Sequence, residues 1–313
     1  MPVSVTNVPI DAAHSGQRLD NFLSGRLKGV PKPRIYRLVR RGEVRVNKGR
    51  VGPDYRLVTG DVVRIPPVRM AAPKEGIIDP GRFEWIEACV LHEDDALMVI
   101  NKPSGLAVHA GSGLSYGLIE ALRALRPHAG FLELVHRLDR ETSGCLMVAK
   151  SRAALLQMHA AWQQDGVAKQ YLALLKGAWI GGTRTIESAL DRDNRRAGMR
   201  HVRVDVEAGQ VAASRFVPRQ RYQQPLAVTL AKIDLLTGRT HQARVHAAHA
   251  GHPIAGDDRY GDRQFNRDLR RLGLKRLFLH AGRLEFKHPT GRRMSVQAPL
   301  PADLESVLNK LHG

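Results

Sequence analysis

The sequence predicts an α+β protein: a mainly antiparallel, mixed sheet with flanking helices, preceded by a small module of the α/β type. Three observations support this prediction. Residues 83–313 hold many short strand-like runs with few helical patterns between them. Residues 16–66 begin with two helical patterns and finish with short strands. Residues 67–82 are rich in proline and glycine, which is typical of a linker, so we expect two domains joined by a tether.

Composition and charge indicate a polyanionic partner. The chain has 313 residues, 43% of them hydrophobic, and a formal net charge of +19. Such a charge beside an ordinary apolar fraction favours nucleic acid. A membrane is disfavoured, because no apolar run approaches the roughly 18 residues that a span requires. The chain shows no N-terminal signal pattern, and Cys89 and Cys145 lie in apolar surroundings, so we expect a cytoplasmic protein without a cysteine nucleophile.

The first module has a strongly basic second helix. A helical face at residues 18–23 is followed by a helix that starts at Pro33 and ends at Gly42, and then by strands at 44–46 and 62–65. Its exposed faces carry four arginines, Arg34, Arg37, Arg40 and Arg41. They form either a solvated helix face or a phosphate-binding surface, and their density favours the second interpretation.

The second domain is organised around residues 134–144, which place one carboxylate, Asp139, between Arg137 and Arg140. The apolar run 145–149 follows at once and predicts a buried strand. Asp139 therefore lies in a loop attached to a rigid core element, where functional residues are often found. On composition alone, a surface ion pair with a neighbouring arginine is the alternative.

Alternation and helical spacing predict the other elements of this domain. Residues 183–224 carry no assignable pattern, and His159 and Trp162 occupy positions typical of packing residues. A helix carrying Val245, His246 and His249 is expected to end at Gly251. Strands are expected at 96–100, 169–177, 230–236, 277–281, 284–286 and 294–299, and further helices at 115–125, 152–165 and 301–311.

A group of histidines, His241, His246, His249 and His252, could bind zinc together with Asp257. The His-Glu-x-x-His pattern is absent, however, and no cysteine pair is near. The turn at Gly251–Pro253 would also redirect the chain between the possible ligands. We therefore expect no metal.

The string His136-Arg-Leu-Asp-Arg140 with Thr142-Ser-Gly144 resembles the signature of the RluA family of pseudouridine synthases. Three further segments resemble its other motifs in order: Lys102–His109, Lys169-x-Tyr171, and Thr237–His246 with Gly256–Gly261. Residues 16–66 are similar to the S4 RNA-binding domain. The sequence departs from the family pattern at Gln210 and Ser214, where Lys and Thr are usual, and at Ala243, where Ile is usual. An RNA contact at Gln210 is accordingly not expected.

The resemblance implies the pseudouridine synthase fold and the isomerisation of uridine to pseudouridine in RNA. The expected substrate is 23S ribosomal RNA or an assembly intermediate, with the protein acting as a monomer. The reaction breaks an N-glycosidic bond and forms a C-glycosidic bond on a flipped-out base, with no redox change and no group donor. We therefore expect no cofactor.

The resemblance also implies roles for individual residues. Asp139 would act at the ribose or base, paired with Arg239, while Tyr171 would stack on the uracil and serve as a general base. Arg137 would either enter the space left by the flipped base or clamp a phosphate. The remaining expected RNA contacts are Lys102, His109 and Leu279, the last of these lining the pocket.

Two alternatives stay open. One is a sibling synthase that acts on another 23S site or on transfer RNA. The other is a non-catalytic ribosome-assembly factor that carries an S4 domain, although the three motif residues Asp139, Tyr171 and Arg239 argue against it.

Overall fold

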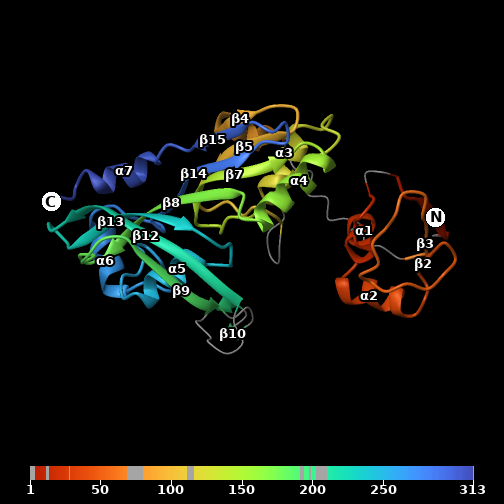
Figure 1. Cartoon of the computed structure of the whole chain (residues 1–313), viewed down its shortest axis with the longest axis horizontal. Helices are drawn as coiled ribbons and strands as arrows, with labels where there is room; N and C mark the ends of the chain where they lie inside the picture. Colours follow the sequence, from red (N-terminus) through yellow and green to blue (C-terminus); the bar gives the residue numbers. More distant parts are fainter. Residues whose placement is uncertain are drawn as a thin grey trace. The chain divides into compact units, whose positions relative to one another are not determined.

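The computed structural model describes residues 4–11, 14–27, 29–68, 80–110, 116–190, 194–196, 199–201 and 210–312. The chain divides into two units, residues 1–77 and 78–313 (Figure 1). The division falls inside the expected linker 67–82, although residues 69–79 of that linker lie outside the described residues. Each unit is described by itself.

The first unit packs two helices against a small antiparallel sheet. Helices α1 (Leu19–Arg26) and α2 (Lys32–Arg40) and strands β2 (Arg45–Val46) and β3 (Val62–Ile65) agree with the sequence prediction. Strand β1 (Thr6–Pro9) was not predicted; it pairs with β3, so the module begins before Gly16. Only Val8 of β1 is buried, and a single apolar residue gives no readable period.

Helix α2 separates its apolar and basic residues onto different faces. Ile35, Leu38 and Val39 are buried in the core of this unit. The four arginines named above are exposed, and none has an ion pair with a described acidic side chain. This face is therefore available to an anionic ligand.

The second unit is built on a ten-stranded mixed sheet in the order β4-β5-β7-β14-β8-β13-β12-β9, with β15 paired to β14 and β6 to β7. Among the described strands of this sheet only the β7–β14 pair is parallel, so the predicted mainly antiparallel sheet is confirmed. The strands are β4 (Val90–Glu93), β5 (Leu97–Lys102), β6 (Glu133–Leu134), β7 (Ser143–Ala149), β8 (Val167–Lys176), β9 (Arg184–Leu190), β12 (Gln210–Tyr222), β13 (Val228–Leu235), β14 (Leu279–Lys287) and β15 (Arg293–Gln297), with a separate hairpin of β10 (Asn194–Arg196) and β11 (Met199–His201).

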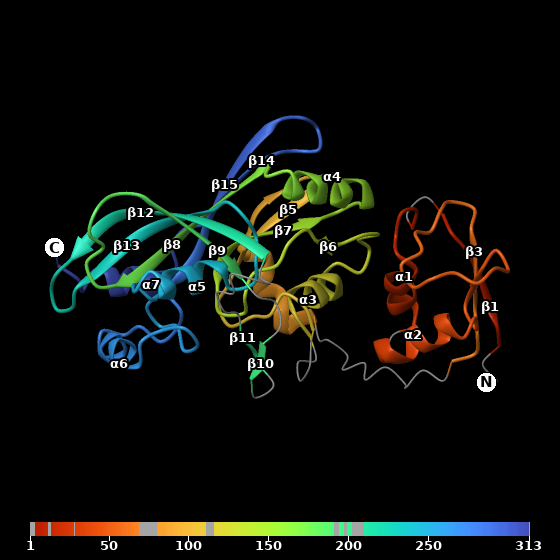
Figure 2. The ribbon, with the colours of Figure 1, turned by 60° about the horizontal axis from the view of Figure 1, so that its bottom comes forward.

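Helices flank this sheet along both of its halves. Figures 1 and 2 show α3 and α4 beside the β4–β7 half, and α5 and α6 beside the half that ends in β9. The helices are the 3₁₀ helix η1 (Pro80–Cys89), α3 (Leu118–Leu125), α4 (Arg152–Gln163), α5 (Gln242–His249), α6 (Arg263–Arg271) and α7 (Ala302–Leu308). No helix of the described chain is both long and apolar enough to cross a membrane.

Several sequence predictions for this unit need correction. The two strands expected at 277–281 and 284–286 are one strand, β14, interrupted by a register shift between His280 and Arg283. The unassigned stretch 183–224 contains β9 and the long strand β12. Helices η1 and α6 were missed. Only two apolar residues of α6, Phe265 and Leu269, are buried, too few for a clear helical period. Ser115, the expected cap of the helix predicted at 115–125, lies outside the described residues, and α3 begins after Gly117.

Strand β7 anchors the loop that carries Asp139. All seven of its residues are buried, and its first residues pair in parallel with β14 at Ser143↔His280 and Gly144↔Ala281. Gly144 has φ +111°, and a Cβ at this position would lie 2.3 Å from the carbonyl oxygen of Ala281. Only glycine fits here, because a side chain would both strain the backbone and separate the two strands.

We predict that Gly144→Ala lowers the free energy of unfolding by about 1–3 kcal/mol, the usual cost of a side chain in such a backbone conformation. Urea denaturation followed by circular dichroism measures the change. Gly282→Ala is the matched control on β14, because its added Cβ meets nothing closer than 3.6 Å. Equal stability of the two variants would contradict the role assigned to Gly144.

Candidate active site

The loop that carries Asp139 is tied to the loop after β5. Gly105 and Arg140 exchange two hydrogen bonds: the Gly105 amide donates to the Arg140 carbonyl at 2.9 Å, and the Arg140 guanidinium donates to the Gly105 carbonyl at 2.8 Å. Ser104 donates to the carbonyl of Glu141 at 2.7 Å. These bonds fix the backbone on the C-terminal side of Asp139.

Lys102 is a structural residue, which corrects the expectation that it contacts an RNA phosphate. Its side chain is fully buried, and its ammonium donates to the carbonyls of Pro103, Leu106 and Arg140 at 2.8–3.0 Å. Burial lowers the pKa of Lys102 to about 7, against the attraction of Glu141 and Asp139. Lys102 therefore joins the loop after β5 to the loop that carries Asp139 from inside the protein, where it does not contact a ligand.

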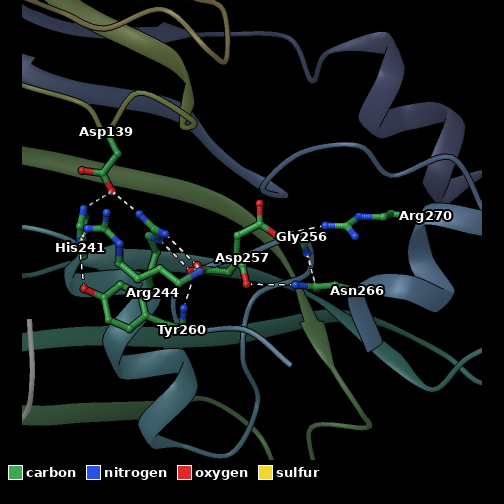
Figure 3. Close-up of polar contacts among 10 residues, drawn as sticks. Asp139, His241, Arg244, Gly256, Asp257, Tyr260, Asn266 and Arg270 are labelled. Atoms are coloured by element: carbon green, nitrogen blue, oxygen red, sulfur yellow. Dashed lines mark hydrogen bonds and ion pairs between the residues drawn. The ribbon is translucent and has the colours of Figure 1, made fainter. Parts of the chain in front are cut away.

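The carboxylate of Asp139 faces a guanidinium that it shares with a second carboxylate (Figure 3). One terminal nitrogen of Arg244 lies 3.3 Å from Oδ2 of Asp139. The other two nitrogens of Arg244 donate to the two oxygens of Asp257 at 2.7 and 2.8 Å. The side chain of Asp257 is fully buried and that of Arg244 is 10% exposed, whereas that of Asp139 is 26% exposed. Asp257 therefore fixes the guanidinium of Arg244 on its buried side, and the remaining terminal nitrogen of Arg244 faces Asp139.

Within this triad of side chains, the electrostatics of the buried pair favour charge on both Arg244 and Asp257. Burial disfavours charge on Arg244, but its contacts, with Asp257 first, outweigh burial and raise its pKa. For Asp257, burial is likewise outweighed by Arg244 and by the amides of Tyr260 and Arg259, and its pKa is lowered.

The structure corrects the predicted partner of Asp139, which is Arg244 and not Arg239. Arg239 is exposed in the loop before α5 and has no ion pair with a described carboxylate. Arg244 lies on the first turns of α5 and points into the protein. Both arginines belong to the same motif, Thr237–His246, and no local pattern of the sequence distinguishes the buried one from the exposed one.

His241 completes the surroundings of Asp139. It adopts a left-handed conformation at the start of α5 (φ +55°), which brings Nε2 to 3.8 Å from Asp139 while Nδ1 lies 2.8 Å from the hydroxyl of Tyr260. Burial, against the pull of Asp139, lowers the pKa of His241 to about 4. The imidazole is therefore neutral at pH 7.

The turn at residues 256–261 positions Asp257. Gly256 has φ +72°, and a Cβ there would lie 2.0 Å from the carbonyl oxygen of Arg276. Asn266 of α6 bridges the turn, because its amide oxygen accepts from the Gly256 amide at 2.9 Å and its amide nitrogen donates to the Asp257 carbonyl at 3.0 Å. Helix α6 is thus directly connected to the triad.

Asp139 opens into a pocket of about 670 Å³. Its walls come from residues 107–109, the loop 134–140, Leu235, residues 238–240, and the side chains of Trp162, Lys169 and Tyr171. His109, Arg137 and Arg239 of the predicted site residues are exposed on this lining. A pocket of this size and mixed polarity can hold a nucleobase with its ribose.

Tyr171 lies on β8 and lines the pocket as expected. Burial, and then the neighbouring Asp139, raise the pKa of its phenol well above the ordinary value. A neutral phenol suits ring packing against a base, but it is a poor proton acceptor at neutral pH. The general-base role of Tyr171 stays a prediction that this shift disfavours.

Trp162 was expected only to pack, yet it also lines the pocket. Its ring stacks on His136 with centroids 4.4 Å apart, and the ammonium of Lys169 lies 5.8 Å from its centroid. Leu279 shows the opposite error: it is buried in the core beside Ala173 and Ile233 and does not line this pocket. Strand periodicity alone cannot distinguish a pocket-lining side chain from a core side chain.

Three of the four histidines of the zinc hypothesis have separate partners. His246 contacts Ser188, His252 contacts the carbonyl of Lys176, and His241 contacts Tyr260. Within the described part of the chain, no group of three or more His, Cys, Asp or Glu side chains is arranged to hold a metal ion.

Comparisons with known proteins agree with this geometry. Residues 96–249 match the RNA pseudouridylate synthase family and residues 17–63 match the S4 domain. The chain is 53% identical over 305 residues to ribosomal large subunit pseudouridine synthase C of Yersinia pestis, covering 96% of this chain and 94% of the relative. It is 52% identical over 313 residues to the protein of that name from Escherichia coli strain K12, covering 98% and 97%.

Two solved human structures share the fold of the second unit. RNA pseudouridylate synthase domain containing 1 superposes with a TM-score of 0.60 at 27% identity, covering 71% of this chain and 87% of the human one. RNA pseudouridylate synthase domain containing 4 superposes with a TM-score of 0.60 at 26% identity, covering 74% and 95%. The chain therefore belongs to the RNA pseudouridylate synthase family, with an S4 domain at its N-terminal end.

Proposed function

We propose that this enzyme converts specific uridines of the large-subunit 23S ribosomal RNA to pseudouridine. The observation that carries the proposal is the carboxylate of Asp139, held by Arg244 at the wall of a base-sized pocket. The large-subunit substrate is supported by the relatives, which match nearly the whole chain and are named for that substrate.

The target uridine must first leave the RNA helix, which costs a few kcal/mol. Arg137 is exposed at the pocket and has no ion pair with a described acidic side chain, so its planar guanidinium is free to occupy the vacated position. The flipped uracil then packs against Tyr171 inside the pocket, beside the wall formed by Trp162 and His136.

The reaction conserves all atoms of the substrate. The bond between N1 of uracil and C1′ of ribose breaks, the ring turns, and C5 bonds to C1′. The proton on C5 is lost, and N1 regains a proton. In a covalent route Asp139 bonds to C1′ and is displaced when C5 attacks; in an elimination route Asp139 takes a proton from C2′ and returns it when C5 bonds to C1′. No electrons are exchanged with another reactant, so the reaction requires no redox cofactor.

Arg244 and Asp257 hold the side chain of Asp139 in position. The guanidinium of Arg244 lies 3.3 Å from Oδ2 of Asp139 and orients this carboxylate. Because Asp257 occupies two nitrogens of Arg244, the third nitrogen has little freedom to move away from Asp139. Asp257 is therefore a positioning residue rather than a catalytic one.

RNA capture involves a surface outside the pocket. We propose that Arg34, Arg37, Arg40 and Arg41 of α2 bind phosphates. We also propose that the enzyme acts as a monomer in the cytoplasm, where a ribosomal RNA substrate would be available.

Asp139→Asn is expected to abolish pseudouridine formation, because the amide cannot stabilise a cationic sugar, while the Kd for RNA changes by less than about threefold. Asp139→Glu displaces the carboxylate by about 1 Å and should lower the rate by roughly 10²-fold. Single-turnover assays with 23S RNA transcripts and carbodiimide mapping measure both variants. Glu141→Gln, in the same loop, is the control. Turnover by Asp139→Asn would remove the basis of the proposal.

Asp257→Asn is expected to lower the single-turnover rate by roughly 10²-fold, since Arg244 loses its bidentate partner and the position of Asp139 relaxes. The affinity for RNA should be retained. Asp258→Asn is the matched control, because this neighbouring carboxylate is 82% exposed and lies outside the triad. A wild-type rate in folded Asp257→Asn would show that the positioning of Arg244 does not depend on Asp257.

Replacing the four α2 arginines by glutamine should weaken RNA binding and reduce the slope of log K against log salt by about 3–4, or roughly 0.7–0.9 for each phosphate that is no longer neutralised. The single-turnover rate at saturating enzyme should change by less than about threefold. Filter binding across a potassium chloride series measures the slope. An unchanged slope would contradict a phosphate-binding role for α2.

A further inference from the structure

The excess positive charge of this protein is not confined to the S4 unit. Of the formal net charge of +19, residues 1–77 carry +9 and residues 78–313 carry +10. Residues 263–275 alone contain five basic residues against one acidic residue, so they hold +4 of the +10. This concentration lies on and directly after α6.

Helix α6 arranges its arginines as a stripe. Arg263, Arg267, Arg270 and Arg271 follow the spacing i, i+4, i+7 and i+8, which places them along one side of a helix. All four are exposed, and Arg270 and Arg271 are 59% and 80% exposed. The stripe spans about 12 Å along the helix axis. We use the name "arginine stripe" for these four residues.

The helix that carries the arginine stripe is firmly attached to the rest of the unit. The opposite side of α6 packs Phe265 and Leu269 into a buried cluster with Leu174 of β8 and Phe278. Asp262 caps the helix by accepting from the amide of Phe265 at 2.8 Å. A helix anchored in this way loses little additional freedom when it binds a ligand.

The stripe is only weakly neutralised. Arg270 lies 3.2 Å from Asp258 and Arg271 lies 3.1 Å from Asp268. Among the described residues, Arg267 donates to the neutral amide of Gln264 and has no ion pair, and Arg263 has no ion pair with a described acid. Exposed ion pairs of this kind are weak, so an anion can displace them.

We propose that the arginine stripe binds the phosphate backbone of the RNA substrate, as a second RNA surface on the catalytic unit in addition to α2. The inference rests on the proposed function. Guanidinium groups match the oxygens of a phosphate with two parallel hydrogen bonds, which favours arginine at such a surface. A backbone contact holds the RNA in register and reads no sequence.

The position of α6 gives this surface a further consequence. Asn266 of the same helix bridges Gly256 and the carbonyl of Asp257, and Asp257 holds Arg244 (Figure 3). None of the four stripe residues lines the Asp139 pocket. RNA bound to the stripe is therefore held outside the pocket by the helix that also supports Asp257 and, through it, Arg244.

The test uses the full-length protein and a protein-free 23S RNA transcript as the probe. The stripe variant combines Arg263→Gln, Arg267→Gln and Arg271→Gln. The matched control combines Lys287→Gln, Arg292→Gln and Arg293→Gln, which removes the same number of exposed charges from the β14–β15 hairpin of the same unit. Thermal unfolding of both variants confirms that each is folded.

The stripe variant should bind the transcript about tenfold more weakly near 0.15 M potassium chloride, and its slope of log K against log salt should fall by about two. Pseudouridine formation should fall similarly at subsaturating enzyme and recover at saturating enzyme. The control variant should bind within about threefold of the wild type. Wild-type affinity and slope in the stripe variant would overturn the inference. An equal weakening in the two variants would also overturn it, because bulk charge would then explain the effect.

The same experiment separates this inference from the proposed function. If the wild-type enzyme forms pseudouridine in the transcript while the stripe variant binds normally, only the stripe inference fails. If the stripe variant loses affinity and slope but the wild-type enzyme forms no pseudouridine in 23S RNA, the inference stands and the proposed substrate fails.

Discussion

The site depends on one buried guanidinium shared between two carboxylates. Removing charged groups from water costs several kcal/mol for each ion, and such a cost is offset only when the partners are well oriented. Arg244 meets this condition through its two hydrogen bonds to the carboxylate of Asp257. The same carboxylate also accepts hydrogen bonds from the backbone amides of Arg259 and Tyr260. The carboxylate of Asp139 is left facing the pocket with a single donor from Arg244. The local excess of negative charge therefore lies where a cationic sugar would form.

This arrangement requires the two halves of the sheet to meet correctly. Asp139 comes from the loop between β6 and β7, while Arg244 comes from α5, which packs beside β9 and β12. The parallel pairing of β7 with β14 and the close contact at Gly144 fix the distance between these halves. Lys102 then joins the loop after β5 to the loop of Asp139 through backbone carbonyls, so a buried cation sets the geometry without touching the substrate.

Positive charge outside the pocket serves a different purpose from the charge inside it. The arginines of α2 and of the arginine stripe are exposed on helices whose opposite faces are buried. Such surfaces supply affinity that depends on salt and carries little sequence information. Under the proposed function, the pocket would select the base and the two helices would keep the RNA near it.

The sequence by itself determined the class of fold, most element positions, the basic face of α2 and the loop that carries Asp139. These features are local, because periodicity, turn residues and short motifs act over a few neighbouring positions. Strand β1 and helix α6 were not recognisable, because each contains too few apolar residues to produce a periodic pattern. Only the tertiary structure decided that Arg244 rather than Arg239 meets Asp139, that Lys102 is buried, and that Trp162 rather than Leu279 lines the pocket. Asp139 and Arg244 are 105 positions apart, and which side chains meet across that distance is set by strand order and packing, which no local pattern encodes.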